Sequence, residues 1–252
     1  MVSGQDIPFW QEFFVKFYQA FIEADRWKQY FQGAGTTILV TIMALGIGIA
    51  LGVFMAIVRT AHDQKLPGTV NPLLRLLNAI CKAYITVIRG TPMMVQLLIM
   101  SIVIFSSSRN YTMVGALTLG INSGAYVAEI IRGGLMALDP GQMEAGRSLG
   151  LSYWDTMRFI VIPQAFKSVL PALGNEFIVL LKDTSLINVI GGKELVHAAQ
   201  GIITRTYEQM FPLLGVAMIY LILVMILTKL LNILERRLQQ GDRHKKFKQI
   251  IS

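Results

Sequence analysis

One stretch limits the fold of this chain more than any other: residues 35–58 form an apolar run without a single charged side chain. About 20 apolar residues in a helix are enough to cross the hydrocarbon core of a bilayer. Only 15% of the residues of the chain are charged, whereas soluble domains carry about 25%. The chain is therefore predicted to be an all-α integral membrane protein.

Four further apolar segments complete a predicted domain of five membrane-spanning helices over residues 35–238. The expected spans cover residues 35–58, 87–105, 113–131, 168–190 and 212–234. Residues 73–83 are also apolar, but they include Arg75 and Lys82. They are predicted to form a cytoplasm-side helix that leads into the second span. In the first span, Ala44, Gly48 and Gly52 recur every fourth residue, a spacing that lets a neighbouring helix approach closely.

The distribution of basic residues predicts how these spans are oriented. Segments 59–89, 132–167 and 235–252 contain fifteen Lys and Arg residues, whereas segments 1–34, 106–110 and 191–210 contain six. Loops rich in Lys and Arg stay in the cytoplasm. The amino terminus is therefore predicted outside, and residues 239–252 are predicted to form a basic cytoplasmic tail. Because the positive charge lies at the ends of spans, the net charge of +8 does not indicate nucleic-acid binding.

Residues 1–34 are predicted to form an amphipathic helix at the membrane interface. Aromatic side chains recur there at roughly helical spacing, which is typical of interfacial helices. They are Phe9, Trp10, Phe13, Phe14, Phe17, Tyr18 and Phe21. An aromatic face that packs on another protein explains the pattern equally well.

A polar, broken segment at about residues 139–166 separates the third and fourth predicted spans. It reads Glu-Ala-Gly at 144–146, three residues, Gly150, nine residues and Ile-Val-Ile-Pro at 160–163. This layout resembles the cytoplasmic coupling loop of ABC importer permeases, Glu-Ala-Ala, three residues, Gly, nine residues, Ile-x-Leu-Pro. It departs from that pattern at Gly146 and Ile162, and the Glu-Ala-Gly form is typical of the polar amino-acid branch.

The resemblance implies a type I ABC importer permease fold with a coupling helix that docks on an ATP-hydrolysing subunit. The residues it assigns to this contact are Glu144, Ala145, Gly146, Leu149 and Gly150. An ordinary amphipathic hairpin in the cytoplasm is the alternative.

Polar residues inside the spans are candidates for substrate binding. Asn122, Tyr126 and Glu129 are spaced i, i+4 and i+7, so they share one face of the third span. An ionisable side chain within a span costs about 2.5–3.5 kcal/mol and normally faces a cavity or a partner. The ammonium group of an amino acid needs acceptor oxygens, and its carboxylate needs amide or hydroxyl donors. The predicted substrate-binding residues are Asn122, Ser123, Tyr126, Glu129, Asp183, Thr184, Ser185, Thr91 and Gln96. For Glu129 and Asp183, a structural bond to Arg132, Arg89 or Lys182 is an equal alternative.

Three of these stretches, residues 89–96, 121–129 and 182–186, look like signatures of polar amino-acid permeases of the histidine, glutamine or arginine type. The resemblance implies the permease subunit of an ATP-driven importer in a bacterial plasma membrane. It implies a second permease chain, identical or homologous, and an extracytoplasmic amino-acid-binding protein. Two further subunits would bind ATP and Mg²⁺, so this chain would need no cofactor and perform no catalysis. The transported amino acid and the choice between homodimer and heterodimer stay open.

Two other classes of function are alternatives. A secondary transporter or channel that is independent of ATP predicts internal repeats, and the sequence shows no convincing repeat. A membrane scaffold gives no reason for carboxylates within two spans. His62, His197 and His244 are too scattered to predict a metal site.

Overall fold

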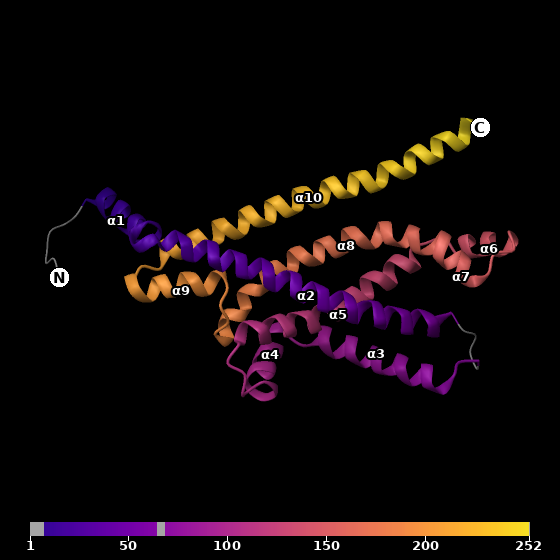
Figure 1. Cartoon of the computed structure of the whole chain (residues 1–252), viewed down its shortest axis with the longest axis horizontal. Coiled ribbons are helices and arrows are strands. Elements are labelled where there is room, and N and C mark those ends of the chain that lie inside the picture. Colours follow the sequence, from indigo (N-terminus) through magenta and orange to yellow (C-terminus); the bar gives the residue numbers. More distant parts are fainter. Residues whose placement is uncertain (1–7, 65–68, 252) are drawn as a thin grey trace.

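The computed structural model describes residues 8–64 and 69–251, and from residue 239 on it describes the backbone alone. All the regular elements within these ranges are helices, arranged as an elongated bundle (Figure 1). In chain order they are α1 (Phe9–Phe21), η1 (Glu23–Asp25), α2 (Arg26–Asp63), α3 (Pro72–Gly90), α4 (Met93–Leu98), η2 (Ile99–Ile104), α5 (Tyr111–Met136), α6 (Gly141–Ser148), α7 (Tyr153–Thr156), η3 (Met157–Val161), α8 (Ile162–Asp183), η4 (Thr184–Ile190), α9 (Leu195–Thr206) and α10 (Met210–Ile251).

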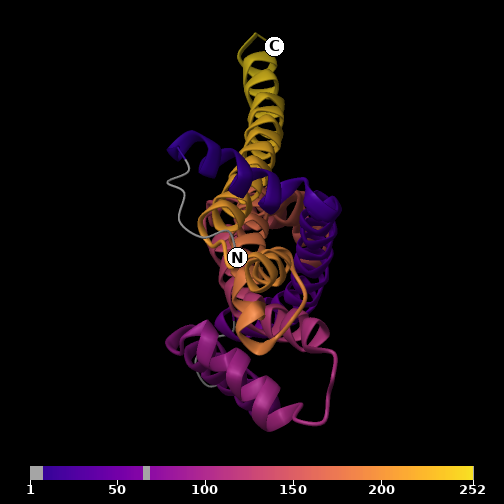
Figure 2. The ribbon, with the colours of Figure 1, turned by 90° about the vertical axis from the view of Figure 1, so that its left-hand side faces the viewer.

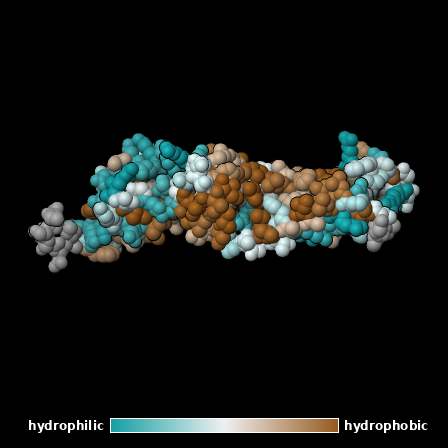
Figure 3. Space-filling model, turned by 90° about the horizontal axis from the view of Figure 1, so that it is seen from below, coloured by the Kyte–Doolittle hydropathy of each residue, from teal (hydrophilic) through white to brown (hydrophobic). Residues whose placement is uncertain are grey.

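Three helices in the described residues are long and apolar enough to cross a membrane: the helix that includes α2, then α5 and α10. They contain the predicted first, third and fifth spans. A fourth candidate arises if α3 and the α4–η2 pair count as one broken span. Seen from below, an apolar belt crosses the middle of the molecule, and hydrophilic side chains gather towards its ends (Figure 3). The chain is therefore an all-helical membrane protein with three or four candidate spans, where the sequence analysis predicted five.

The second predicted span, residues 87–105, is not one continuous helix. Its first residues belong to α3, which ends at Gly90, and the axis then bends by 106° before α4 and η2. Pro92 explains the break, because the residue before a proline is disfavoured in helical conformation, and Thr91 is extended at φ −117°, ψ 142°. Residues 73–83, predicted as a separate helix on the cytoplasmic side, form the first half of α3.

The fourth predicted span, residues 168–190, is divided between α8 and η4. It is not among the helices that are apolar enough to count as candidate spans. Its polar side chains explain this, because Glu176, Lys182 and Asp183 lower the mean hydropathy of α8.

The helices alternate in direction along the long axis of the bundle (Figure 1). One end carries α6, α7, the start of α3 and the carboxy-terminal end of α10, and the opposite end carries α1 and α9, which face the viewer in Figure 2. The coupling segment, the start of α3 and the carboxy-terminal end of α10 thus lie at the same end of the molecule. The orientation of the chain in the membrane stays a prediction.

The amino-terminal segment contains α1, a kink and the first turns of α2, so residues 1–34 do not form a single helix. Positive φ angles at Ala24 and Asp25, 54° and 56°, produce the kink. Phe13 packs edge-on against Phe211 of α10, with ring centroids 4.9 Å apart. Phe9 and Trp10, in contrast, are 70% and 68% exposed. Placement of α1 at a membrane interface stays a prediction, and residues 1–7 lie outside the described part of the chain.

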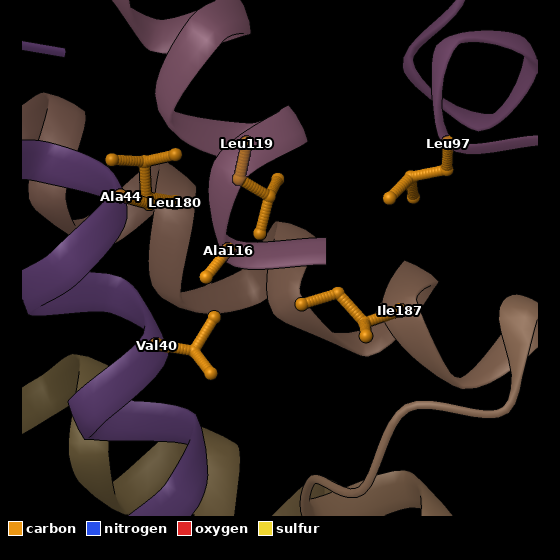
Figure 4. Close-up of a cluster of buried hydrophobic side chains, with 7 residues drawn as sticks. All are labelled: Val40, Ala44, Leu97, Ala116, Leu119, Leu180 and Ile187. Atoms are coloured by element: carbon orange, nitrogen blue, oxygen red, sulfur yellow. The ribbon is translucent and has the colours of Figure 1, made fainter. Parts of the chain in front are cut away.

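The main core lies where α2, α4, α5, α8 and η4 converge (Figure 4). Its buried side chains are Val40, Ala44, Leu97, Ala116, Leu119, Leu180 and Ile187. Helices α2 and α5 approach closely because glycines on α2 face α5. A Cβ atom at Gly52 would lie 2.5 Å from Cγ1 of Val127 and 2.9 Å from the backbone nitrogen of Ala128. Small residues at every fourth position of α2 were predicted to allow close helix packing, and this prediction is confirmed at Gly52.

Gly52→Ala is expected to lower the free energy of unfolding by about 1–2 kcal/mol, because an added methyl group overpacks the α2–α5 contact. Gly46→Ala is the matched control, since a Cβ at Gly46 meets nothing within 4 Å. Thermal unfolding of the two detergent-solubilised variants measures the difference. Equal midpoints would contradict a packing role for Gly52.

Candidate functional site

A polar cluster lies at the bend between α3 and α4, within the apolar part of the bundle. The Gln96 side chain is largely buried there. Its Nε2 donates to the carbonyl oxygen of Ile88 at 2.8 Å and to Oγ1 of Thr91 at 2.8 Å. Its Oε1 accepts a hydrogen bond from Nδ2 of Asn122 on α5 at 3.0 Å. Three of the predicted substrate-binding residues therefore contact one another, and Gln96 stabilises the broken backbone of the bend.

Tyr126, one helical turn after Asn122, has an open face. Its ring is 36% exposed, and the guanidinium carbon of Arg89 lies 5.3 Å from the ring centroid. A cation at this distance is attracted to the face of the ring. The bend thus combines amide groups, a phenol and a guanidinium group at one place on the α3–α5 surface, all of which can donate hydrogen bonds to a carboxylate.

Glu129 is occupied by two arginines of its own chain. Arg59 of α2 contacts one carboxylate oxygen through Nη1, and Nη2 of Arg132 lies 3.2 Å from the other. The side chains of Arg59, Glu129 and Arg132 are 12%, 24% and 27% exposed. Glu129 therefore links α2 to α5 in a partly buried ion-pair cluster. The sequence analysis gave a structural bond to Arg132 as an alternative to substrate binding, and this bond is present.

A second carboxylate between helices was given no role in the sequence analysis. Glu176 of α8 is 9% exposed, and its Oε1 accepts a hydrogen bond from Oγ of the fully buried Ser123 at 2.7 Å. Ser123 was predicted to bind substrate, and in this structure its hydroxyl joins α5 to α8. The sequence does contain a signal for Glu176, because it is an acidic residue among apolar ones. An ionisable side chain within a span is costly unless it has a partner.

The end of α8 places three predicted residues in different surroundings. Thr184 is buried, and its Oγ1 donates to the carbonyl oxygen of Leu181 at 2.7 Å. Ser185 donates to the carbonyl oxygen of Lys182, also at 2.7 Å. Asp183 is half-buried, and within the described part of the chain its carboxylate accepts no hydrogen bond. Among the predicted acidic residues, Asp183 is thus the one whose carboxylate is open to a ligand.

A buried acid also fixes the start of α9. Glu194 is 1% exposed and caps this helix by accepting hydrogen bonds from the backbone N–H groups of Val196 and His197, both at 2.8 Å. The phenol of Tyr220 on α10 donates to the same carboxylate at 3.2 Å. Burial raises the pKa of Glu194, and the backbone donors oppose that shift. Sequence reasoning missed this residue, which holds α9 and α10 together.

The predicted coupling segment folds into two short helices, α6 and α7, at the end of the bundle opposite α1 and α9 (Figure 1). Glu144, Ala145 and Leu149 are exposed, and Leu149 is 77% exposed. Gly146 faces its own chain instead, because a Cβ there would lie 2.5 Å from Cγ2 of Thr156. Gly146 therefore lets α6 approach α7 closely, and its predicted contact with an ATP-hydrolysing subunit stays a prediction.

Gly150 connects α6 to α7 in the left-handed conformation, at φ +77°. A Cβ at Gly150 would meet nothing within 4 Å. Glycine is therefore needed here for its backbone conformation and not for space.

The predicted coupling segment also contacts the end of a predicted span. The Tyr153 hydroxyl donates to Oε1 of Gln64, which follows α2. A cavity of about 300 Å³ lies between the ends of α2 and α5 and the segment formed by α6 and η3. A direct contact therefore joins α7 to the residue that follows α2. Trp154, which is 77% exposed on α7, is a further candidate contact residue that sequence reasoning missed.

Residues 71–240 match the family described as binding-protein-dependent transport system inner membrane component. The glutamine transport system permease protein GlnP of Escherichia coli K12 is 36% identical over 212 residues, which cover 82% of this chain and 92% of GlnP. The putative glutamine transport system permease protein GlnP of Rickettsia conorii is 32% identical over 235 residues, covering 90% and 98%. A chain of an amino acid ABC transporter solved with histidines superposes with a TM-score of 0.75 at 40% identity, covering 83% of this chain and 94% of that one.

Proposed function

The chain belongs to the family of binding-protein-dependent transport system inner membrane components, and we propose that it forms the translocation pathway of an ATP-driven importer for a polar amino acid of the glutamine, arginine or histidine type. The observation that carries this proposal is the 40% identity, over 83% of the chain, to a solved amino acid ABC transporter. The names of the relatives, which are glutamine permeases, support the substrate class. ATP hydrolysis belongs to separate subunits.

The proposed substrate path runs along the face of α5 that carries Asn122 and Tyr126, near the end of α8. Asn122 and Tyr126 would offer hydrogen-bond donors to the substrate carboxylate. Thr91 and Gln96 would shape the path instead, since their own donors are used within the bend, by Val87 for Thr91 and by Ile88 and Thr91 for Gln96. Asp183 would accept the ammonium group or a cationic side chain. The contacts described above favour a structural role for Glu129, Ser123 and Thr184, and Ser185 is the exposed hydroxyl beside Asp183.

We further propose that five segments cross the membrane: α2, the broken α3–α4–η2 segment, α5, α8 and α10. The alternating directions of these elements support this (Figure 1). Within α8, Glu176 faces Ser123 of α5, which lowers the cost of placing its carboxylate at membrane depth. The amino terminus would lie outside a bacterial plasma membrane and the carboxy terminus in the cytoplasm, as the fifteen basic residues on one side favour.

In this orientation α6 and α7 lie in the cytoplasm, where the exposed Glu144, Ala145, Leu149 and Trp154 would contact an ATP-binding subunit. The assembly would contain two permease chains and two such subunits with bound ATP and Mg²⁺. An extracytoplasmic amino-acid-binding protein would deliver the substrate to the α1 and α9 end. ATP-driven closure of the two partner subunits would move α6, and the contact of Tyr153 with Gln64 would pass this movement to α2.

Purification of the tagged chain from its native membrane, followed by reconstitution into proteoliposomes, tests the proposal. We expect the chain to copurify with subunits that hydrolyse ATP, and polar amino acids with their binding protein to stimulate that hydrolysis. A panel of the twenty amino acids would identify the substrate. Uptake without any copurifying ATPase would point to a secondary carrier and would contradict the proposal.

Asp183→Asn is expected to raise the substrate concentration needed for half-maximal stimulation of ATP hydrolysis by up to about fivefold. A half-exposed charge pair contributes about 1 kcal/mol or less, which sets this limit. Basal hydrolysis should not change, because the carboxylate accepts no hydrogen bond within the described part of the chain. Asp63→Asn at the cytoplasmic end of α2 is the control. An unchanged concentration dependence for Asp183→Asn would remove Asp183 from the substrate path.

A further inference from the structure

An apolar groove lies between α8 and α10, away from the polar bend described above. It encloses about 350 Å³, a volume within the range of small-molecule sites, about 300–1,000 Å³. Every side chain that lines it is apolar, including Leu45 on α2, Leu173 and Phe177 on α8, and Leu230 and Leu234 on α10. The groove therefore offers hydrocarbon contacts and no hydrogen-bonding group to a ligand.

The groove persists because α10 diverges from the bundle towards its carboxy-terminal end, as the two views along and across the long axis agree (Figures 1 and 2). The most apolar window of α10 is only 17% buried by the rest of the chain, and Leu230 is 58% exposed. At Gly174 the two helices still touch, since a Cβ there would lie 2.4 Å from Cδ1 of Leu231. The groove is thus an apolar wedge that opens to the exterior of the chain.

Basic side chains lie at one end of this wedge. Arg237 follows Leu230 by seven residues and Leu234 by three, so it continues the groove-lining stripe of α10 by one turn. Lys167 precedes Leu170, which also lines the groove, by three residues on α8 and extends the facing stripe in the same direction. Glu235 follows the groove-lining Leu231 by four residues, so it borders the same stripe at the edge opposite Arg237, from which it is two residues away.

From this arrangement we propose that the α8–α10 groove binds an anionic phospholipid, with an acyl chain against the leucines and the phosphate at Arg237 and Lys167. Acyl chains match the apolar lining, and basic residues at a membrane surface attract anionic headgroups. The ligand is a component of the bilayer and not the transported molecule. The inference depends only on the Arg237 end of α10 lying at a bilayer surface, so it does not depend on the substrate class or on which side of the membrane that end occupies.

Native mass spectrometry of the full chain, purified in detergent with whatever subunits accompany it, tests the proposal. Dioleoylphosphatidylglycerol or dioleoylphosphatidylcholine is added, and the spectra report bound lipid and the number of permease chains together. We expect the anionic lipid to bind more tightly than the zwitterionic one. Arg237→Gln should weaken the binding of phosphatidylglycerol by about fivefold. One basic residue near an anionic surface contributes about 1 kcal/mol, which corresponds to this factor. Arg158→Gln, an exposed arginine on η3, is its control.

A second pair of variants tests the groove itself. Leu230→Trp should fill it and abolish retention of phosphatidylglycerol, whereas Leu221→Trp should not, because Leu221 is 52% exposed on the same helix and does not line the groove. Equal retention of lipid by both variants would overturn the site. Equal binding of the two lipids would overturn the role of the basic residues. If Leu230→Trp instead separates permease chains without loss of lipid, a second copy of the chain occupies the groove and the proposal is wrong.

Discussion

Glu129→Gln is expected to lower the free energy of unfolding by about 3 kcal/mol. Removing one member of a buried ion pair costs about 3–5 kcal/mol, because it leaves an uncompensated charge. The lower end applies here because the Glu129 side chain is 24% exposed. The variant leaves Arg59, whose side chain is 12% exposed, without its only ion-pair partner in the described part of the chain. The contact between α2 and α5 at their carboxy-terminal ends should then loosen.

Thermal unfolding of the purified chain in detergent measures this effect, and a double-mutant cycle assigns it. Arg59→Gln combined with Glu129→Gln should cost less than the sum of the single variants, because the two side chains interact directly. Glu144→Gln serves as the control, since Glu144 is exposed on α6. A variant of Glu129 that kept wild-type stability but lost stimulation by substrate would show that this carboxylate binds substrate, and the structural assignment would fail.

Hydropathy predicted the parts of the fold that the bilayer itself dictates. The apolar runs in α2, α5 and α10 match candidate spans, because the thickness of the bilayer sets their length whatever their neighbours are. The second span was misjudged because its apolar residues continue on both sides of Thr91 and Pro92. The sequence does contain the break, but the 106° bend depends on how α3 packs against α2 and α5. The contacts made by α3 were not visible in the apolar pattern.

The residue types of the candidate site were predictable from the sequence, but the contacts between side chains on different helices were not. The spacing of Asn122, Tyr126 and Glu129 places them on one face of α5, but their partners differ. Asn122 contacts Gln96, whereas Glu129 contacts Arg59, 70 residues earlier in the chain. Such pairings depend on the depth and rotation of each helix. The periodicity within one helix gives no information on the depth or the rotation of that helix. The contact of Glu176 with Ser123 was missed for the same reason.

The largest expected effect on transport itself arises at Gly150, between α6 and α7. Gly150→Val should lower uptake at least tenfold (about 1.4 kcal/mol) while ATP hydrolysis by the partner subunits continues. The space around this residue is open, so steric clash is not the reason. At φ +77°, an L-residue costs about 1–2 kcal/mol, and a β-branched residue more. The connection would leave the left-handed conformation and displace α6, and with it the surface that includes Glu144 and Leu149.

Gly150→Asn separates this backbone explanation from a side-chain one, because asparagine adopts the left-handed conformation more readily than other non-glycine residues. Proteoliposomes that contain each variant with its ATPase and binding protein give the ratio of amino acid taken up to ATP hydrolysed. We expect a ratio near wild type for Asn and a strongly reduced ratio for Val. If both variants lose uptake equally, a side chain at position 150 blocks the contact with the partner, and the left-handed turn is not what coupling requires. If Val transports normally, the segment has no part in coupling, since its one conformationally demanding residue would then be dispensable.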